Sequence, residues 1–274
     1  MSYPDLPEPL PAPVVDNHCH LDFARGEDSL PVPEALARAA AVGVTRIVQI
    51  GCDVPSARFA EEAARTYDNV IGGAALHPND APLQADLEAA LAEIERLVVA
   101  HPKMRVVGET GLDFFRTGEE GRAVQTESFR RHIDLAKRHD KTLQIHDRDA
   151  HDAVLAVIDS EGAPERWVMH CFSGDAAFAR ACLDRGAYLS FSGTVTFKNA
   201  AYLREALAIV PRDRILVETD APFLTPHPHR GATNSAYMVP TTMRVMAEVL
   251  SADLKTLCVS VDENTDRAYG GSWG

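Results

Sequence analysis

Histidine and carboxylate residues recur in this sequence directly after short β-branched runs. Eleven histidines occur among 274 residues, and imidazole and carboxylate groups are common ligands of catalytic metal ions. The positions concerned are His18, His20, His77, Glu109, His146, His170 and Asp220. Taken singly, each has a structural alternative, such as a capped turn for Glu109 or Asp220. These alternatives are independent of one another, whereas one metal site explains the positions together.

The composition of this set predicts how many ions are bound. His18 and His20 stand at i and i+2, so on a strand both imidazoles point the same way. Without His77, the set has four imidazoles and two carboxylates, which exceed one tetrahedral ion but serve two divalent ions bridged by a carboxylate, for which Glu109 is the natural candidate. The metal ligands predicted in this way are His18, His20, Glu109, His146, His170 and Asp220. Imidazole ligands favour Zn²⁺ or Mn²⁺ and oxygen ligands favour Mg²⁺, so all three stay open.

The elements that position these residues alternate between two kinds. Short β-branched runs occupy residues 14–16, 46–50, 70–76, 105–109, 142–146, 167–170, 188–191 and 215–219. Segments with apolar residues at helical spacing lie between them, for example Leu83, Leu87, Leu91, Ile94 and Val98. Eight strands alternating with helices predict an α/β fold, a (β/α)₈ TIM barrel, whose active sites lie at the C-terminal ends of the strands. A doubly wound open sheet is the alternative.

The overall composition excludes several classes of protein. Five scattered cysteines without a C-x-x-C pair argue against a disulfide framework and favour a cytoplasmic location. No apolar run approaches a membrane span. A net charge of −13 is unsuited to general nucleic-acid coating but permits an enzyme with a local metal-filled groove. Residues 1–13, rich in proline, are predicted to form an extended arm, and residues 14–274 a single domain. Residues 237–250 suit an outer helix or a subunit interface, so no oligomeric state is predicted.

Motifs of other enzyme classes are absent. The sequence contains no Walker loop and no G-x-G-x-x-G, G-x-S-x-G or H-E-x-x-H pattern. A P-loop NTPase, a nicotinamide oxidoreductase and a serine hydrolase of the usual elbow type are therefore disfavoured.

Seven ordered blocks between about residues 14 and 269 resemble those of the TatD-type metal-dependent hydrolases. They begin with the D-N-H-C-H-L-D segment at 16–22 and L-H-P at 76–78. They continue with G-E-T-G-L-D at 108–113, H-D-R at 146–148, H-C-F-S-G at 170–174, T-F-K-N-A at 196–200 and E-T-D-A-P at 218–222. The resemblance implies a dinuclear barrel enzyme with deoxyribonuclease activity, often exonucleolytic on single-stranded or damaged DNA.

The resemblance also assigns roles to residues. It implies one ion held by His18, His20, Glu109 and Asp220, and a second held by Glu109, His146 and His170. Asp220 is the candidate to orient and deprotonate the attacking water, so Asp220 and Glu109 are the predicted catalytic residues. Two departures stand out. The family's N-E-P triplet is replaced by Asn234-Ser235-Ala236, and Phe114 stands where an aromatic hydroxyl is frequent.

Four cationic or histidine side chains are predicted to bind substrate phosphates: His77, Arg148, Lys198 and Arg230. Phe172 or Phe114 is a candidate for stacking on a base. The predicted function is metal-dependent hydrolysis of DNA phosphodiester bonds by a metal-activated water. An amidohydrolase cleaving a C–N or ester bond of a small molecule, and a non-catalytic binding protein on a retired barrel, are the alternatives.

Overall fold

The computed structural model describes residues 3–23 and 30–274, and its centre is one eight-stranded parallel sheet. The strands neighbour one another in chain order: β1 (Val14–Cys19), β2 (Val44–Gly51), β3 (Val70–Ala74), β4 (Met104–Asp113), β5 (Thr142–Arg148), β6 (Trp167–Met169), β7 (Tyr188–Phe191) and β8 (Ile215–Val217). Consecutive order from first to last excludes a doubly wound sheet, in which the order reverses. The predicted (β/α)₈ barrel is confirmed.

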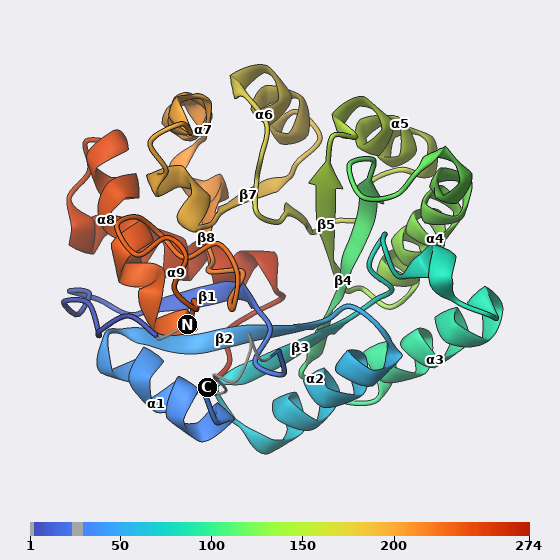
Figure 1. Cartoon of the computed structure of the whole chain (residues 1–274), viewed down its shortest axis with the longest axis horizontal. Helices are drawn as coiled ribbons and strands as arrows, with labels where there is room; N and C mark the ends of the chain where they lie inside the picture. Colours follow the sequence, from blue (N-terminus) through green and yellow to red (C-terminus); the bar gives the residue numbers. More distant parts are fainter. Residues whose placement is uncertain (1–2, 24–29) are drawn as a thin grey trace.

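Helices surround this sheet (Figure 1). They are α1 (Val32–Ala41), α2 (Val54–Thr66), α3 (Leu87–Val99), α4 (Glu119–Arg138), α5 (His151–Glu161), α6 (Ala176–Leu183), α7 (Ala201–Ile209), α8 (Val239–Val249) and α9 (Leu254–Ala268). Side-chain caps fix several starts. Asp86 accepts the amide hydrogen of Ala89, so α3 begins after it. The apolar stripe predicted from Leu83 is therefore wrong at its first member, which lies 77% exposed in a short 3₁₀ turn.

The seam between β8 and β1 is closed by few backbone bonds. The amides of Asp220 and His20 donate to the carbonyls of His18 and Ala221, at 2.9 and 2.8 Å. Below them, the Asn17 side-chain amide donates to the Val217 carbonyl at 2.8 Å. Asp16 accepts from the amide and the hydroxyl of Thr219. Polar side chains of β1 thus complete the barrel beside the residues predicted to bind metal.

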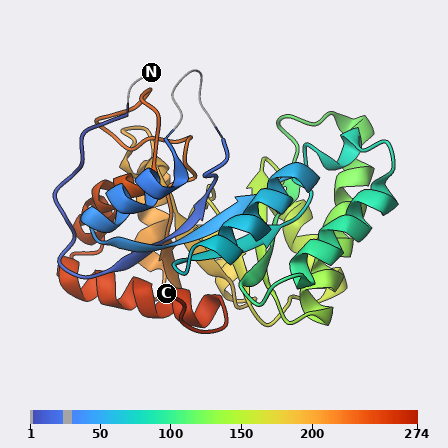
Figure 2. The ribbon, with the colours of Figure 1, turned by 90° about the horizontal axis from the view of Figure 1, so that it is seen from below.

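The barrel interior toward the N-terminal ends of the strands is apolar, and it is covered there by the C-terminal segment. Its buried cluster includes Val15, Val48, Ile71, Val106, Val168 and Leu216, together with Tyr269 and Trp273. Thr142, the first residue of β5, donates to the carbonyl of Ala268. Figure 2 shows α9 along the lower edge of the view. The C-terminal segment therefore closes the end of the barrel opposite the candidate site.

Residues 3–13 contain no helix or strand and lie against the C-terminal helices. The Tyr237 hydroxyl donates to the Pro4 carbonyl at 2.7 Å. Arg244 on α8 donates to the carbonyls of Glu8 and Pro9. Within the described residues, no helix is long and apolar enough to cross a membrane.

A buried histidine on α4 predicts a pH dependence of stability. His132 meets the Ser128 carbonyl through Nδ1 and accepts the Leu76 amide at Nε2. Burial lowers its pKa from 6.5 to about 4. On acidification, His132 therefore binds a proton near pH 6.5 in the unfolded chain but only near pH 4 in the folded chain. This proton should lower the free energy of unfolding by about 3 kcal/mol over that range.

Urea unfolding between pH 7 and pH 4 measures this effect against a His132→Gln variant. Glutamine can supply a donor and an acceptor but does not titrate, so the variant should lose less stability on acidification than the wild type. Equal losses in the two proteins would contradict the assignment to His132.

Candidate metal centre

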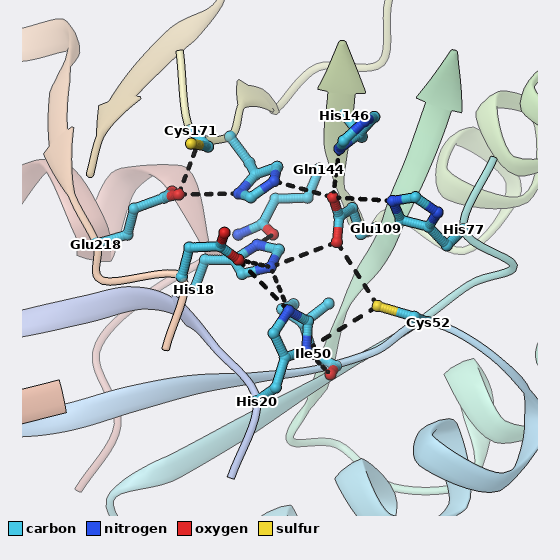
Figure 3. A network of polar contacts seen from close by, with 12 residues as sticks. His18, His20, Ile50, Cys52, His77, Glu109, Gln144, His146, Cys171 and Glu218 are labelled. Atoms are coloured by element: carbon cyan, nitrogen blue, oxygen red, sulfur yellow. Dashed lines mark hydrogen bonds and ion pairs between the residues drawn. The ribbon is translucent and has the colours of Figure 1, made fainter. Parts of the chain in front are cut away.

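Four candidate ligand atoms converge near the ends of β1 and β8, beside the middle of β4 (Figure 3). His18 Nε2 lies 3.2 Å from His20 Nε2, 3.5 Å from Glu109 Oε2 and 3.7 Å from Asp220 Oδ1. His20 Nε2 lies 3.5 Å from the same Asp220 oxygen. In a tetrahedral zinc site with bonds of about 2.0–2.1 Å, neighbouring ligand atoms are about 3.3 Å apart. The donor set therefore fits one ion.

The other oxygen of Glu109 faces a second group of nitrogens. Glu109 Oε1 lies 2.7 Å from His146 Nδ1 on β5 and 2.9 Å from His170 Nε2, directly after β6. Glu109 thus presents one oxygen to each group, as a bridging carboxylate does. Three sets of described residues have ligand atoms all within 4.8 Å of one another: His18–His20–Glu109, His18–His170–Glu218 and His77–Glu109–His146. Among the described residues, none of these sets joins His146 with His170, although both meet the same oxygen of Glu109.

The hydrogen bond at the far nitrogen of each imidazole fixes its tautomer. A nitrogen that donates there leaves the other nitrogen bare for an ion. His18 Nδ1 meets Gln144 Oε1 at 2.7 Å, and His20 Nδ1 meets the Ile50 carbonyl at 2.9 Å. His146 Nε2 lies 3.3 Å from Asp113 Oδ2, and His170 Nδ1 lies 2.9 Å from Glu218 Oε1. In neutral form, all four imidazoles present a bare nitrogen to the centre.

His77 has the opposite arrangement. Its Nδ1 accepts the backbone amide of Asn79 at 3.0 Å, so the neutral ring carries its hydrogen on Nε2. That nitrogen faces Glu109 Oε1 at 3.5 Å. His77 is therefore a hydrogen-bond donor toward the centre, and this tautomer separates it from the four candidate ligands.

The carboxylates of the centre keep their negative charge. Burial alone would raise the pKa of Glu109, but the charges of His170 and His77 lower it well below its usual range. Burial opposes, and the hydrogen bond to His20 favours, the lowered pKa of Asp220. For His146, burial is outweighed by hydrogen bonds to Asp113 and Glu109, which raise its pKa to about 9. A buried anionic cluster of this kind suits divalent cations.

The predicted phosphate-binding cations lie around this centre rather than in it. Arg148 ends β5, with its guanidinium 4.0 Å from the Phe115 ring centroid. Arg230 is exposed, and its guanidinium lies 4.1 Å from the Phe197 ring centroid. Lys198 is exposed on the segment after β7.

The two aromatic residues predicted to stack on a base are both removed from solvent, Phe172 fully and Phe114 partly. Phe172 is 1% exposed and stacks against Phe178, so its prediction as a base platform is wrong. Phe114 is partly buried beneath Arg122. The sequence missed Phe23 and Phe223, which are 42% and 44% exposed and flank His20, with ring centroids 5.1 and 6.4 Å from the imidazole. No periodicity marks single exposed rings, although both stand within three residues of predicted ligands.

The segment that departs from the family pattern lies beside His20. The Asn234 side-chain amide donates to the carbonyls of Thr219 and Phe223, which ties the loop to the end of β8. Ser235 and Ala236 line a cavity of about 50 Å³ together with His20 and Phe23. Asn234 therefore anchors this part of the loop, and the small side chains after it line the cavity beside His20.

Known proteins resemble this chain along almost its whole length. The family model described as "TatD related DNase" matches residues 15–270. The uncharacterized metal-dependent hydrolase TatD of Mycobacterium tuberculosis is 48% identical over 264 residues, covering 95% of this chain and 99% of that protein. The uncharacterized metal-dependent hydrolase YabD of Bacillus subtilis is 39% identical, covering 93% and 98% of the two chains.

Solved structures show the same fold. The crystal structure of YJJV, a TatD homologue from Escherichia coli, superposes with a TM-score of 0.87 at 26% identity, covering 94% of this chain and 98% of that chain. A hydrolase of the TatD family from Entamoeba histolytica gives a TM-score of 0.84 at 17% identity, covering 96% and 100%.

Proposed function

This chain belongs to the TatD-related family of metal-dependent hydrolases, and on that premise we propose that it hydrolyses phosphodiester bonds of DNA with two divalent ions. The observation that carries the proposal is Glu109, whose two oxygens face separate groups of imidazole nitrogens. Paired ions bridged by a carboxylate suit phosphodiester hydrolysis, because they stabilise charge on both the attacking and the leaving oxygen.

We assign two groups of residues to binding the ions and one carboxylate to proton transfer. His18, His20, Glu109 and Asp220 would hold the first ion, and Glu109, His146 and His170 would hold the second. When bound, the ions supply Lewis-acid chemistry and neutralise phosphate charge. The Asp220 side chain is 16% exposed and that of Glu109 only 6%. Asp220 is therefore the more open carboxylate, and it takes the proton from the attacking water.

Cationic groups and hydrogen-bond donors around the centre bind the phosphates of the DNA backbone. The Nε2–H of His77 points toward the centre and donates to a phosphate oxygen of the substrate. Arg148 and Arg230 are each held over an aromatic ring, which preorganises their guanidinium groups for further phosphates, and Lys198 adds a nearby cation. Local cations of this kind allow binding by a chain whose net charge is −13.

Exposed aromatic rings favour a single-stranded substrate. The Phe23 and Phe223 ring centroids are 6.3 Å apart, beside His20. Unpaired bases stack on such rings, whereas the bases of a duplex are already stacked and paired. We therefore assign single-stranded or frayed DNA ends as the substrate and exonucleolytic release as the reaction. We assign the reaction to the cytoplasm on the basis of the five free cysteines.

Nucleotide release from end-labelled DNA tests the proposal. Chelator-treated protein is assayed alone and after addition of Mg²⁺, Mn²⁺ or Zn²⁺, on a single strand and on the blunt duplex of the same sequence, with a Glu109→Gln variant as the inactive control. We expect release that depends on metal and favours the single strand, in a ladder that starts at one end. No cleavage of either substrate by protein that holds two ions would overturn the proposal.

A further inference from the structure

The two groups of imidazoles are held by different kinds of acceptor. In the first group, the acceptors are neutral: the Gln144 side-chain oxygen for His18 and the Ile50 carbonyl for His20. In the second group, both acceptors are carboxylates, Asp113 for His146 and Glu218 for His170. The direct ligands show the opposite distribution of negative charge between the two groups. The first group contains Glu109 and Asp220, whereas the second contains only the shared Glu109.

Glu218 is an unusual residue for a barrel interior. Its side chain is fully buried, and Oε1 accepts both from the His170 ring and from the Cys171 amide, each at 2.9 Å (Figure 3). Among the described residues, Oε2 is buried without a hydrogen-bond partner. A buried carboxylate with one unsatisfied oxygen is costly unless a nearby positive charge compensates for it. The imidazole of His170 is the group through which a bound cation can do so.

Asp113 holds His146 in a comparable way but is itself better supported. Its Oδ1 accepts the amides of Phe115 and Arg116. Its Oδ2 accepts the Asn79 side-chain amide at 2.9 Å and faces His146 Nε2 at 3.3 Å. These bonds fix the carboxylate at the end of β4, so the His146 ring turns Nδ1 toward Glu109.

We propose that Asp113 and Glu218 are positioning residues that determine occupancy of the second metal position, and that the first position fills independently of them. This inference rests on the proposed two-ion function. The second position has three protein ligands, of which the shared Glu109 is the only carboxylate, so its ligands neutralise less charge than those of the first. A carboxylate behind each imidazole makes the ring a stronger donor and adds negative charge close to the ion. The two positions are therefore unequal, and the second depends on residues outside its ligand set.

The test counts and titrates ions rather than measuring DNA cleavage. Glu218→Gln keeps a side-chain oxygen for His170 and Cys171 but removes the charge. Zn²⁺ and Mn²⁺ are titrated into metal-free wild type and variant by calorimetry, and bound metal is counted by elemental analysis. We expect two ions in the wild type. In the variant, we expect the first ion to bind unchanged and the second to bind about 10- to 100-fold more weakly.

Two further variants provide a second test and a control. Asp113→Asn should weaken the same second ion, which keeps the test decisive if Glu218→Gln fails to fold. Asp16→Asn alters another fully buried carboxyl of the same region, one that accepts from Thr219 and from the His18 backbone amide but meets no imidazole in the described structure, and it should keep both ions. Two ions bound with wild-type affinity in both Glu218→Gln and Asp113→Asn would overturn the inference, as would loss of the first ion. A wild type that binds one ion would overturn the two-ion function itself, and this outcome is visible before any variant is made.

Discussion

An Asp220→Asn variant supplied with saturating metal is expected to hydrolyse single-stranded DNA about 10³-fold more slowly than the wild type. Asparagine keeps an oxygen where Asp220 Oδ1 faces His18 and His20, so the site retains much of its shape. Unlike a carboxylate, the amide of asparagine has no oxygen basic enough to take a proton from water. The main loss should therefore fall on kcat, with a smaller change in KM, and steady-state rates on a labelled oligonucleotide measure both.

An Asp149→Asn variant provides the matched control for Asp220. Asp149 follows β5 at the same end of the barrel, is exposed, and lies outside both ligand groups. The variant removes one acidic charge from this face and should keep kcat within about twofold, since exposed charges have small effects. If Asp220→Asn with bound metal has a kcat near that of the wild type, then another group accepts the proton from the attacking water.

The strand order and the grouping of the predicted ligands follow from local sequence. Residues 46–50 are buried along their whole length, as a run that is apolar on both faces predicts for a parallel strand covered by helices. Strands that alternate with helices run parallel, so their C-terminal ends meet at one mouth. Residues in the C-terminal halves of those strands or just after them, from His18 to Asp220, therefore lie close together although they are separated by some 200 positions.

The strand ends were harder to predict, because polar residues there face the barrel interior. The sequence ends the fourth strand at residue 109, but β4 continues to Asp113, where Leu112 and Asp113 still pair with Asp147 and Arg148. The first strand likewise runs to Cys19 instead of residue 16. Conversely, β3 stops at Ala74, two residues before the predicted end. An apolar pattern alone cannot separate a polar interior position from a loop.

The partners of the predicted ligands were missed because their contacts are distant in sequence. Gln144 stands two residues before His146 on β5, so period two places both on one face of the strand. Its amide also donates to the Asn17 carbonyl and the Tyr269 hydroxyl, 127 and 125 positions away. Only the closed barrel shows that the C-terminal segment thereby fixes the amide that orients His18.

Removal of metal is expected to lower the melting temperature by about 10 °C relative to protein reloaded with Zn²⁺ or Mn²⁺. An ion that binds only the folded chain stabilises it by about 4 kcal/mol when free metal is 1,000 times its Kd. For a domain of this size, each kcal/mol corresponds to about 2–4 °C. The ligands come from β1, β4, β5 and the segments after β6 and β8. Without metal, protonated imidazoles take the place of the ions beside buried Glu109 and Glu218 and part-buried Asp220.

Two histidine variants show whether this stabilisation arises at the candidate centre. His18 belongs to two of the ligand clusters, so His18→Ala should lose most of the metal-dependent rise in melting temperature. His132 is equally buried, and among the described residues it bonds to α4, Thr110 and the Leu76 amide and to no predicted ligand, so His132→Gln should melt differently overall and yet keep the full rise. Calorimetric scans of chelated and reloaded samples of each variant give the two differences in melting temperature to be compared. If metal raises the melting temperature of His18→Ala as much as that of His132→Gln, the ions bind elsewhere, and the convergence of imidazoles at the barrel mouth has another cause.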